Sequence, residues 1–185
     1  MLRPFLVELT KLSRSAKLVT LIIGLVCASL AFAAKDSKTP SIWSDQYTGP
    51  AWLTDLDKAR ALAITSGKPL LLFFSGSDWC PPCKKADRKI FSQPAFHEFA
   101  QENYVLVNVD FPENTELPRQ LSERNEDLVD EYKVPGFPYV VLLDPAKPDR
   151  SERFGACGFL GLICSEKRLI NKAGEFRKAG QGLAL

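Results

Sequence analysis

The segment PLLLFFSGSDWCPPC, Pro69–Cys83, joins an apolar run to a pair of cysteines. Its first part, Pro69–Phe74, is continuously apolar, which is typical of a strand buried on both faces of a sheet. Its last part places Cys80 and Cys83 at the start of a stretch of helical composition that reaches about Phe91. The segment therefore predicts a buried strand, a short loop and a helix that begins at a Cys-x-x-Cys motif.

Stretches typical of helices and strands alternate on both sides of this segment. Before it, apolar residues recur at helical spacing after Thr54, where Thr54 and Asp57 match a capping box, and Gly67 is expected to end that helix. The elements expected after it are the strands Tyr104–Asp110 and Tyr139–Leu143, the helices Pro94–Glu102, Glu116–Tyr132 and Ser165–Lys178, and a turn at Asp144–Arg150. This alternation predicts an α/β domain built around βαβ connections.

The composition is that of a globular protein. Of the 185 residues, 45% are hydrophobic and 25% are charged, which excludes collagen-like, coiled-coil and wholly disordered chains. The 24 basic and 22 acidic residues leave a small positive excess, which lies within residues 1–34. The remainder is nearly neutral and has no stripe of Lys and Arg, so no nucleic-acid partner is expected. The five cysteines are too few for a disulfide scaffold but suffice for redox or metal chemistry.

Residues 1–34 have the pattern of a secretory signal peptide. A basic beginning is followed by Leu18–Ala34, which carries no charge and includes the small-residue motif Ala31-Phe32-Ala33. This order predicts cleavage just after the motif. Two alternatives stay open. One is an uncleaved membrane anchor, because the apolar run is near the minimum length of a spanning helix, and the other is a lipoprotein lipidated at Cys27.

All three interpretations place the rest of the chain outside the cytoplasm, where disulfides persist. The protein is thus expected to be periplasmic or secreted, with membrane anchoring as the variant. Residues 35–50 are polar and hold two prolines, so they are expected to form a linker or arm. Residues 51–185 are then expected to form one domain.

The Cys-x-x-Cys motif predicts a reactive thiol. At a helix N-terminus, Cys80 meets unpaired backbone N–H groups and the positive end of the helix dipole, both of which favour a thiolate. The pKa of a free thiol is about 8.5, and such sites lower it to roughly 3.5–7.5. Cys83, one turn later, is expected to lie behind Cys80 and to attack a mixed disulfide formed there. Pro81 and Pro82 are tolerated because the first helical turn does not use its N–H groups.

Two other uses of the cysteine pair are disfavoured. A zinc site needs a second pair of ligands at suitable spacing, and His97 is the only histidine, so no metal is expected. His97 itself is expected to be exposed on its helix and not catalytic. A purely structural disulfide would not need the context of strand, loop and helix. No cofactor is expected.

Two motifs together resemble the active site of the thioredoxin superfamily. The first is Trp79 followed by Cys-Pro-Pro-Cys, and the second is Val134–Pro138 before the strand Tyr139–Leu143, which resembles the cis-proline loop. The signal segment and the Gly76–Cys80 lead-in resemble Dsb-type oxidoreductases of the bacterial periplasm, the DsbH-like proteins among them. The resemblance covers about Thr54–Phe154 and implies a thioredoxin-like fold, in which helices flank a central mixed β-sheet.

The resemblance also implies a role for each site residue. Cys80 is the attacking thiol, Cys83 is the resolving thiol, and the two form a redox-active disulfide. Pro138 is the cis-proline. Trp79, Phe137 and Pro138 are expected to contact the substrate, which adds to the backbone of Phe137 like a strand.

The implied activity is that of a secreted thiol–disulfide oxidoreductase that reduces or isomerises disulfides in exported proteins. Its expected partners are those proteins and a thiol electron donor, for example a membrane reductase. The sequence departs from the family pattern in two ways. First, Phe74 and Leu106 stand where thioredoxins have a buried acid and a lysine, and second, no histidine lies between the cysteines. The second departure favours a reductase or isomerase over an oxidase. A non-catalytic peptide-binding module with the same fold is the alternative.

The C-terminal third matches the family pattern less well. Gly155–Cys164 is apolar and contains Cys157 and Cys164. These two cysteines are expected to be small buried residues, with a disulfide or a second redox couple as the alternative.

Overall fold

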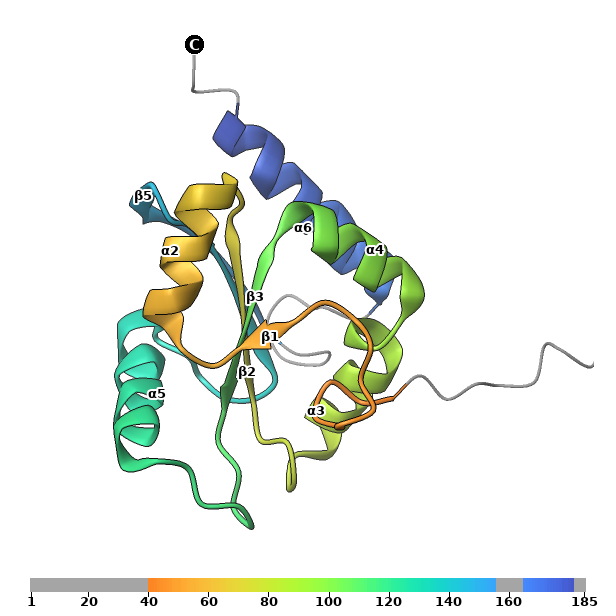
Figure 1. Cartoon of the computed structure of the whole chain (residues 1–185), viewed down its shortest axis with the longest axis vertical. Coiled ribbons are helices and arrows are strands. Elements are labelled where there is room, and N and C mark those ends of the chain that lie inside the picture. The colour runs from red at the N-terminus through yellow and green to blue at the C-terminus, as the bar shows by residue number, and fades with distance from the viewer. Residues whose placement is uncertain (1–39, 156–164, 182–185) are drawn as a thin grey trace, which may run out of the picture. The chain divides into compact units, whose positions relative to one another are not determined.

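The computed structural model describes residues 40–155 and 165–181 (Figure 1). The expected signal segment and the residues Cys27, Cys157 and Cys164 lie outside these ranges, so the interpretations that concern them stay predictions. Within the two ranges, no helix combines the length and the apolar character that crossing a membrane requires.

Five strands form one mixed sheet in the described part of the chain, in the order β1-β3-β2-β4-β5. The strands are β1 (Trp52–Leu53), β2 (Leu70–Ser75), β3 (Val105–Asp110), β4 (Tyr139–Asp144) and β5 (Lys147–Gly155). The first three run parallel to one another, whereas β4 runs antiparallel to both β2 and β5. The mixed sheet and the three strands expected from apolar runs are therefore confirmed.

Helices cover both faces of the sheet. They are α2 (Leu56–Ser66), α3 (Pro81–Ala86), a π-helical segment η2 (Asp87–Phe91), α4 (Pro94–Asn103), α5 (Arg119–Tyr132) and α6 (Glu166–Gln181). Two separate apolar clusters show that α2 and α5 pack on one face, and that η2, α4 and α6 pack on the other. Figure 1 shows the same division, with α2 and α5 on one side of the strands and α4 and α6 on the opposite side. The expected α/β architecture is thus confirmed.

Strand β2 is the centre of the domain. All six of its residues are buried, because β3 and β4 pair with its two edges and a helical layer covers each face. Leu72 and Phe74 belong to the cluster under α2 and α5, whereas Phe73 belongs to the opposite cluster. Burial on both faces is the reason why this strand is a continuous apolar run and does not alternate. Phe74 and Leu106, which stand where thioredoxins have a buried acid and a lysine, lie in the clusters on opposite faces of the sheet.

Helix α2 begins one residue later than the capping box suggested. The N-cap is Asp55, whose Oδ1 accepts hydrogen bonds from the backbone N–H groups of Asp57 and Lys58, both at 3.1 Å. The expectation of a cap at Thr54 was therefore wrong, although both residue types suit the position. The helix ends where expected, because Gly67 adopts a left-handed conformation with φ of 63°.

Two further boundaries differ from the expectation. Helix α5 begins at Arg119 and not at Glu116, because Leu117 precedes Pro118 and the residue before a proline avoids the helical conformation. The expected turn at Asp144–Arg150 is shorter, since β5 already begins at Lys147.

Residues 40–50, called the arm from here on, contact the domain. Ile42 and Trp43 pack against the cluster under α4 and α6, and the Trp43 ring lies 6.3 Å from that of Phe73. The backbone N–H of Ile42 donates to Oδ1 of Asp87, which is buried at the start of η2, at 3.1 Å. The arm therefore packs against the helical segment that follows the cysteine motif.

His97 on α4 is half-buried, so the expectation of an exposed histidine was wrong. Its Nε2 lies 3.2 Å from the Tyr47 hydroxyl and 2.9 Å from the carbonyl oxygen of Phe91. The Trp52 indole N–H donates to the same hydroxyl at 3.3 Å. His97 therefore helps to fix the arm and has no place at the cysteine pair.

Candidate active site

Cys80 and Cys83 lie at the beginning of a helix, as expected, and a disulfide joins them. Cys80 is the N-cap of α3, and its Sγ accepts a hydrogen bond from the backbone N–H of Cys83 at 3.2 Å. Their Cα atoms are 5.2 Å apart, and the residues are 2% and 0% exposed. The helical backbone continues through Ala86 and Asp87 into η2, so the dipole at Cys80 belongs to more than the short α3.

The local sequence explains this arrangement. Pro81 and Pro82 occupy the first two helical positions, where their fixed φ fits and no intrahelical N–H is required. Because neither proline has an N–H, the first amide after Cys80 that can donate to its sulfur is that of Cys83. Before the motif, the Lys84 amino group donates to the carbonyl oxygen of Asp78 at 2.7 Å and ties the loop to the helix.

The cis-proline loop ends at the same edge of the sheet. The Phe137–Pro138 peptide bond is cis, and Pro138 is buried. Tyr139, the first residue of β4, pairs with Phe74 near the end of β2, in antiparallel register. Since the end of β2 leads directly to the cysteines, the sheet register brings the loop and the cysteine motif to one place.

Three aromatic side chains lie together at this edge, and they are called the aromatic rim. Trp79 is 39% exposed, and its ring lies 6.1 Å from that of Phe137. The Phe111 ring stacks on Phe137 at 4.9 Å with an interplanar angle of 22°. The Trp79 indole N–H donates to the carbonyl oxygen of Phe111 at 2.6 Å. The structure thus places the expected residues Trp79 and Phe137 together and adds Phe111, which the sequence did not single out.

A carboxylate at the end of β3 holds the loop between β2 and the cysteines. Asp110 accepts hydrogen bonds from the Ser75 hydroxyl at 3.0 Å, the Ser77 backbone N–H at 2.9 Å and the Ser77 hydroxyl at 2.5 Å. The side-chain amide of Asn125, buried on α5, donates to the backbone carbonyl of Asp110 at 2.9 Å. The loop between β2 and Cys80 is therefore fixed to β3 and, through β3, to α5.

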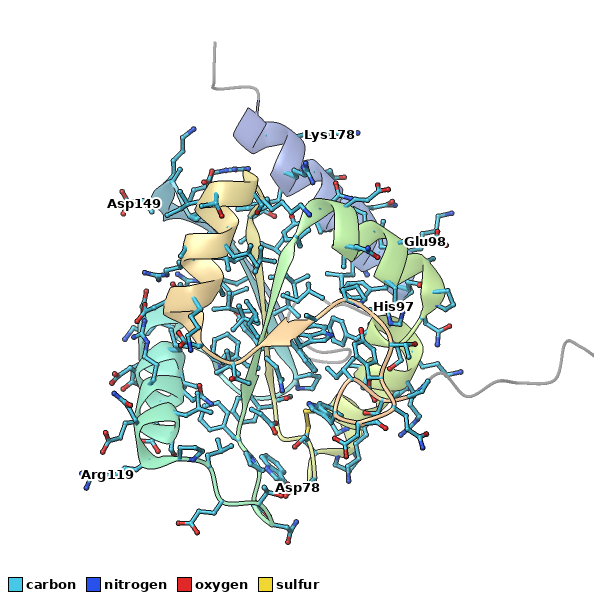
Figure 2. The ribbon with its side chains drawn as sticks, viewed as in Figure 1. Asp78, His97, Glu98, Arg119, Asp149 and Lys178 are labelled. Atoms are coloured by element: carbon cyan, nitrogen blue, oxygen red, sulfur yellow. A yellow bond between two sulfur atoms is a disulfide. The ribbon has the colours of Figure 1, made fainter. Side chains whose placement is uncertain are left out.

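Asp78 joins the same loop to residues 111–118, called the 111–118 loop. Its carboxylate accepts the backbone N–H groups of Glu113 at 3.0 Å and of Asn114 at 2.6 Å. The hydrogen bond from Glu113 is the main reason why the pKa of Asp78 is lowered from its ordinary value, and the bond from Asn114 acts in the same direction. Figure 2 shows Asp78 at one end of the sheet and Lys178 at the other.

Sequence reasoning missed Asp78, Asp110 and Phe111. The signal for Asp78 was its position in a polar loop just before a helix, where an aspartate usually accepts backbone N–H groups. Its actual partners are 35 and 36 residues later in the chain, and no local sequence pattern indicates them.

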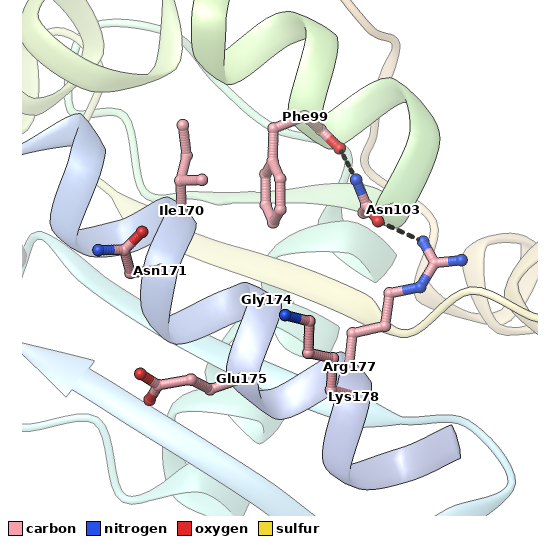
Figure 3. A pocket seen from close by; sticks show the side chains of 8 residues that line it. All are labelled: Phe99, Asn103, Ile170, Asn171, Gly174, Glu175, Arg177 and Lys178. Carbon is pink, nitrogen blue, oxygen red and sulfur yellow. Dashed lines mark hydrogen bonds between the residues drawn. The ribbon is translucent and has the colours of Figure 1, made fainter. Parts of the chain in front are cut away.

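A cavity of about 620 Å³ lies away from the cysteines, between α4 and α6 (Figure 3). Phe99, Ile170 and Gly174 line it together with polar residues such as Asn103 and Arg177. None of the expected site residues takes part, so the candidate site is not this cavity. Among the described residues, no three side chains of His, Cys, Asp or Glu are grouped so that they could hold a metal ion.

Comparison with known proteins identifies the family. A family model described as thioredoxin-like matches residues 51–145. The chain belongs to the thioredoxin-like family. The expected superfamily and fold are thereby confirmed.

Two curated relatives of this thioredoxin-like chain carry Dsb names. Disulfide bond reductase DsbH of Chlamydia pneumoniae is 42% identical over 77 residues, which are 42% of this chain and 46% of the relative. Thioredoxin-related protein DsbJ of the same organism is 29% identical over 126 residues, 68% of this chain and 34% of the relative. The chain thus spans less than half the length of these two curated relatives.

A solved structure named DsbH oxidoreductase superposes on this thioredoxin-like chain with a TM-score of 0.59. The two sequences are 27% identical, and the match covers 75% of this chain and 94% of the other. The relatives therefore support the expected type, a Dsb-like thiol–disulfide oxidoreductase.

Proposed function

We propose that this thioredoxin-like protein is an exported thiol–disulfide oxidoreductase that reduces or isomerises disulfides in exported proteins. The observation that carries the proposal is the Cys80–Cys83 pair at the beginning of a continuous helix, next to the cis-proline loop. Export rests on the pattern of residues 1–34, which is that of a signal peptide.

In the proposed reaction, the reduced Cys80 thiolate attacks one sulfur of a substrate disulfide. The second substrate sulfur leaves as a thiolate and takes up a proton, and a mixed disulfide with Cys80 remains. Cys83 then loses its proton and attacks the Cys80 sulfur, which releases the first substrate sulfur as a thiolate. The substrate has gained two electrons, and the Cys80–Cys83 pair has lost them until a thiol donor restores it.

Isomerisation uses only the first half of this sequence. A thiolate of the substrate itself attacks the mixed disulfide, forms a new substrate disulfide and expels Cys80 as a thiolate. No net electron transfer occurs, and Cys83 serves to release substrates that do not rearrange.

The hydrogen bond to the Cys80 sulfur supports its role as the attacking thiol. The Cys83 N–H points at Sγ, and the helix dipole adds positive potential there, so a thiolate at Cys80 is stabilised. In the described structure, Phe74 is fully buried among apolar side chains where thioredoxins have an acid. Proton transfer from Cys83 therefore passes to water or to another group than a carboxylate at that position.

Replacing each cysteine separately tests the proposal. Reduced wild-type protein should reduce insulin, and Cys80→Ser should lower the rate by about a thousandfold or more, because the nucleophile is lost. Cys83→Ser is the matched variant: it should keep the attack and accumulate a mixed disulfide with the substrate, visible by mass spectrometry. If the wild type reduces insulin no faster than Cys80→Ser and neither exceeds the rate without protein, the proposed enzymatic function fails and the peptide-binding module is favoured.

Pro82, the second of the two prolines, favours a reducing rather than an oxidising protein. An N-cap side chain accepts hydrogen bonds from the second or third helical residue, and the second residue is Pro82, which has no N–H. The thiolate at Cys80 therefore receives fewer hydrogen bonds than in a motif without this proline. A less stabilised thiolate disfavours the reduced pair, and the reduction potential falls.

Pro82→Ala should restore a donor to Cys80. The reduction potential, measured by equilibrium with glutathione, should rise by about 30 mV, equivalent to about 1.4 kcal/mol. Pro81→Ala is the matched control, because the first helical N–H does not point at the N-cap side chain, and it should shift the potential much less. An equal shift in both variants would show that loop stiffness, and not the missing donor, sets the potential.

A further inference from the structure

The 111–118 loop borders the cysteine motif without being part of a strand or helix. It leaves β3 at Phe111, whose backbone N–H donates to the carbonyl oxygen of Ser75 at 2.8 Å, and it enters α5 after Pro118. Glu113 and Asn114 are exposed. Beyond Phe111, the Asp78 carboxylate joins this loop to the residues just before Cys80.

Asp78 and Trp79 act on the loop from adjacent positions. The Asp78 carboxylate accepts hydrogen bonds from two backbone N–H groups of the loop, and the Trp79 indole N–H donates to the carbonyl oxygen of Phe111. The Phe111 ring in the same loop stacks on Phe137, the residue before the cis-proline. Two charge-assisted hydrogen bonds that a carboxylate accepts are stronger than neutral ones, so they can order a loop that has no secondary structure of its own.

The aromatic rim has the character of a surface that receives an apolar side chain. Trp79 is one of the few large hydrophobic side chains exposed in the described residues. Phe111 and Phe137 are partly buried against the cluster beneath α2 and α5, so their rings are held from below. Aromatic side chains that are fixed in this way bind apolar groups at a small cost in conformational entropy.

We propose that Asp78 is a positioning residue for substrate selection, which holds the 111–118 loop so that Phe111 completes a surface for an apolar side chain next to the substrate's cysteine. This inference rests on the proposed function. The substrates favoured are extended segments in which a large apolar residue neighbours a disulfide-bonded cysteine. Asp78 contacts neither sulfur in this role, and the chemistry at Cys80 proceeds without it.

The test compares three disulfides with the reduced protein. Two are disulfide-linked peptides that differ only in a Phe or a Ser next to the cysteine, and the third is bis(2-hydroxyethyl) disulfide. The wild type should prefer the Phe peptide by about tenfold in kcat/KM, the value of burying part of one aromatic ring. Asp78→Ala should reduce this preference to about twofold through KM, and it should leave the rate with the small disulfide unchanged.

Asp55→Ala is the matched control. Asp55 also accepts two backbone N–H groups, but it does so at the start of α2, and its own pKa is lowered by the same kind of hydrogen bond, chiefly from Lys58. This variant should keep the tenfold preference. Asp78→Asn, which retains one carbonyl acceptor, should give an intermediate preference, and a normal melting temperature would show that the variants are folded.

The outcomes separate the inference from the proposed function. If the wild type reduces none of the three disulfides, the proposed function fails and the inference with it. If the wild type is active and Asp78→Ala keeps the preference, or loses activity equally with all three disulfides, the inference alone is overturned. Loss of the preference in Asp55→Ala as well would also overturn it, because selection would then depend on general stability.

Discussion

The arm and the 111–118 loop are both held by an aspartate that is far away in the sequence. Asp87 binds the backbone N–H of Ile42 across 45 residues, and Asp78 binds those of Glu113 and Asn114 across 35 and 36 residues. The two carboxylates differ in burial: Asp87 is 2% exposed, whereas Asp78 lies partly exposed at the surface. The same kind of contact therefore has different consequences in the two regions.

Burial decides which consequence dominates. When a buried carboxylate is removed, the buried donors that bonded to it cannot form hydrogen bonds with water instead. The same holds for a buried carboxylate whose donors are removed. In both cases the free energy of unfolding falls. At the surface, water replaces a lost hydrogen bond, and little stability is lost. The arm is thus expected to contribute to stability, and the 111–118 loop to the shape of the site.

The largest effect that separates the two regions is expected from Asp87→Ala. The variant leaves the Ser92 hydroxyl, which donates to Asp87 at 2.6 Å, and the Ile42 N–H without their acceptor. The free energy of unfolding, measured with urea, should fall by about 2 kcal/mol. Asp87→Asn keeps a carbonyl acceptor and should lose less. Unchanged stability in Asp87→Ala would contradict the contrast with Asp78.

A smaller effect is expected from pH. The pKa of Asp78 in the folded protein is lowered from its ordinary 3.8. Its carboxylate is therefore charged and holds the loop at every pH above 3.8, and it releases the loop only as the pH falls through the lowered pKa. The preference for the Phe peptide should therefore be constant from about pH 5 to about pH 8. A preference that already declines between these limits would show that another group orders the loop.

Much of the fold could be predicted because its signals are local. The run Pro69–Phe74 is apolar at every position, since both faces of β2 are covered, and Gly67 ends α2 by its own conformational freedom. The position of Cys80 at a helix N-terminus follows from the two prolines after it. These features depend on residues within one turn or one strand of each other.

The features that escaped prediction depend on distant partners. Strand β1 has two residues, and only its pairing with Leu106 and Val107 on β3 makes it a strand. His97 is half-buried because the arm returns to cover it with Tyr47, which the phase of its own helix does not reveal. Asp78 could be suspected of binding N–H groups, but the sequence does not say that these belong to the 111–118 loop.

The central position of β2 also limits where this chain can change in length. Side-chain direction repeats every two residues along a strand, so one residue inserted within Leu70–Ser75 would send each following side chain into the wrong cluster and move Cys80 out of step with Pro138. Lengthening the 111–118 loop leaves that register intact. Insertions are therefore best accommodated in that loop, which borders the Cys80–Cys83 motif and lies outside the strands that align it with Pro138.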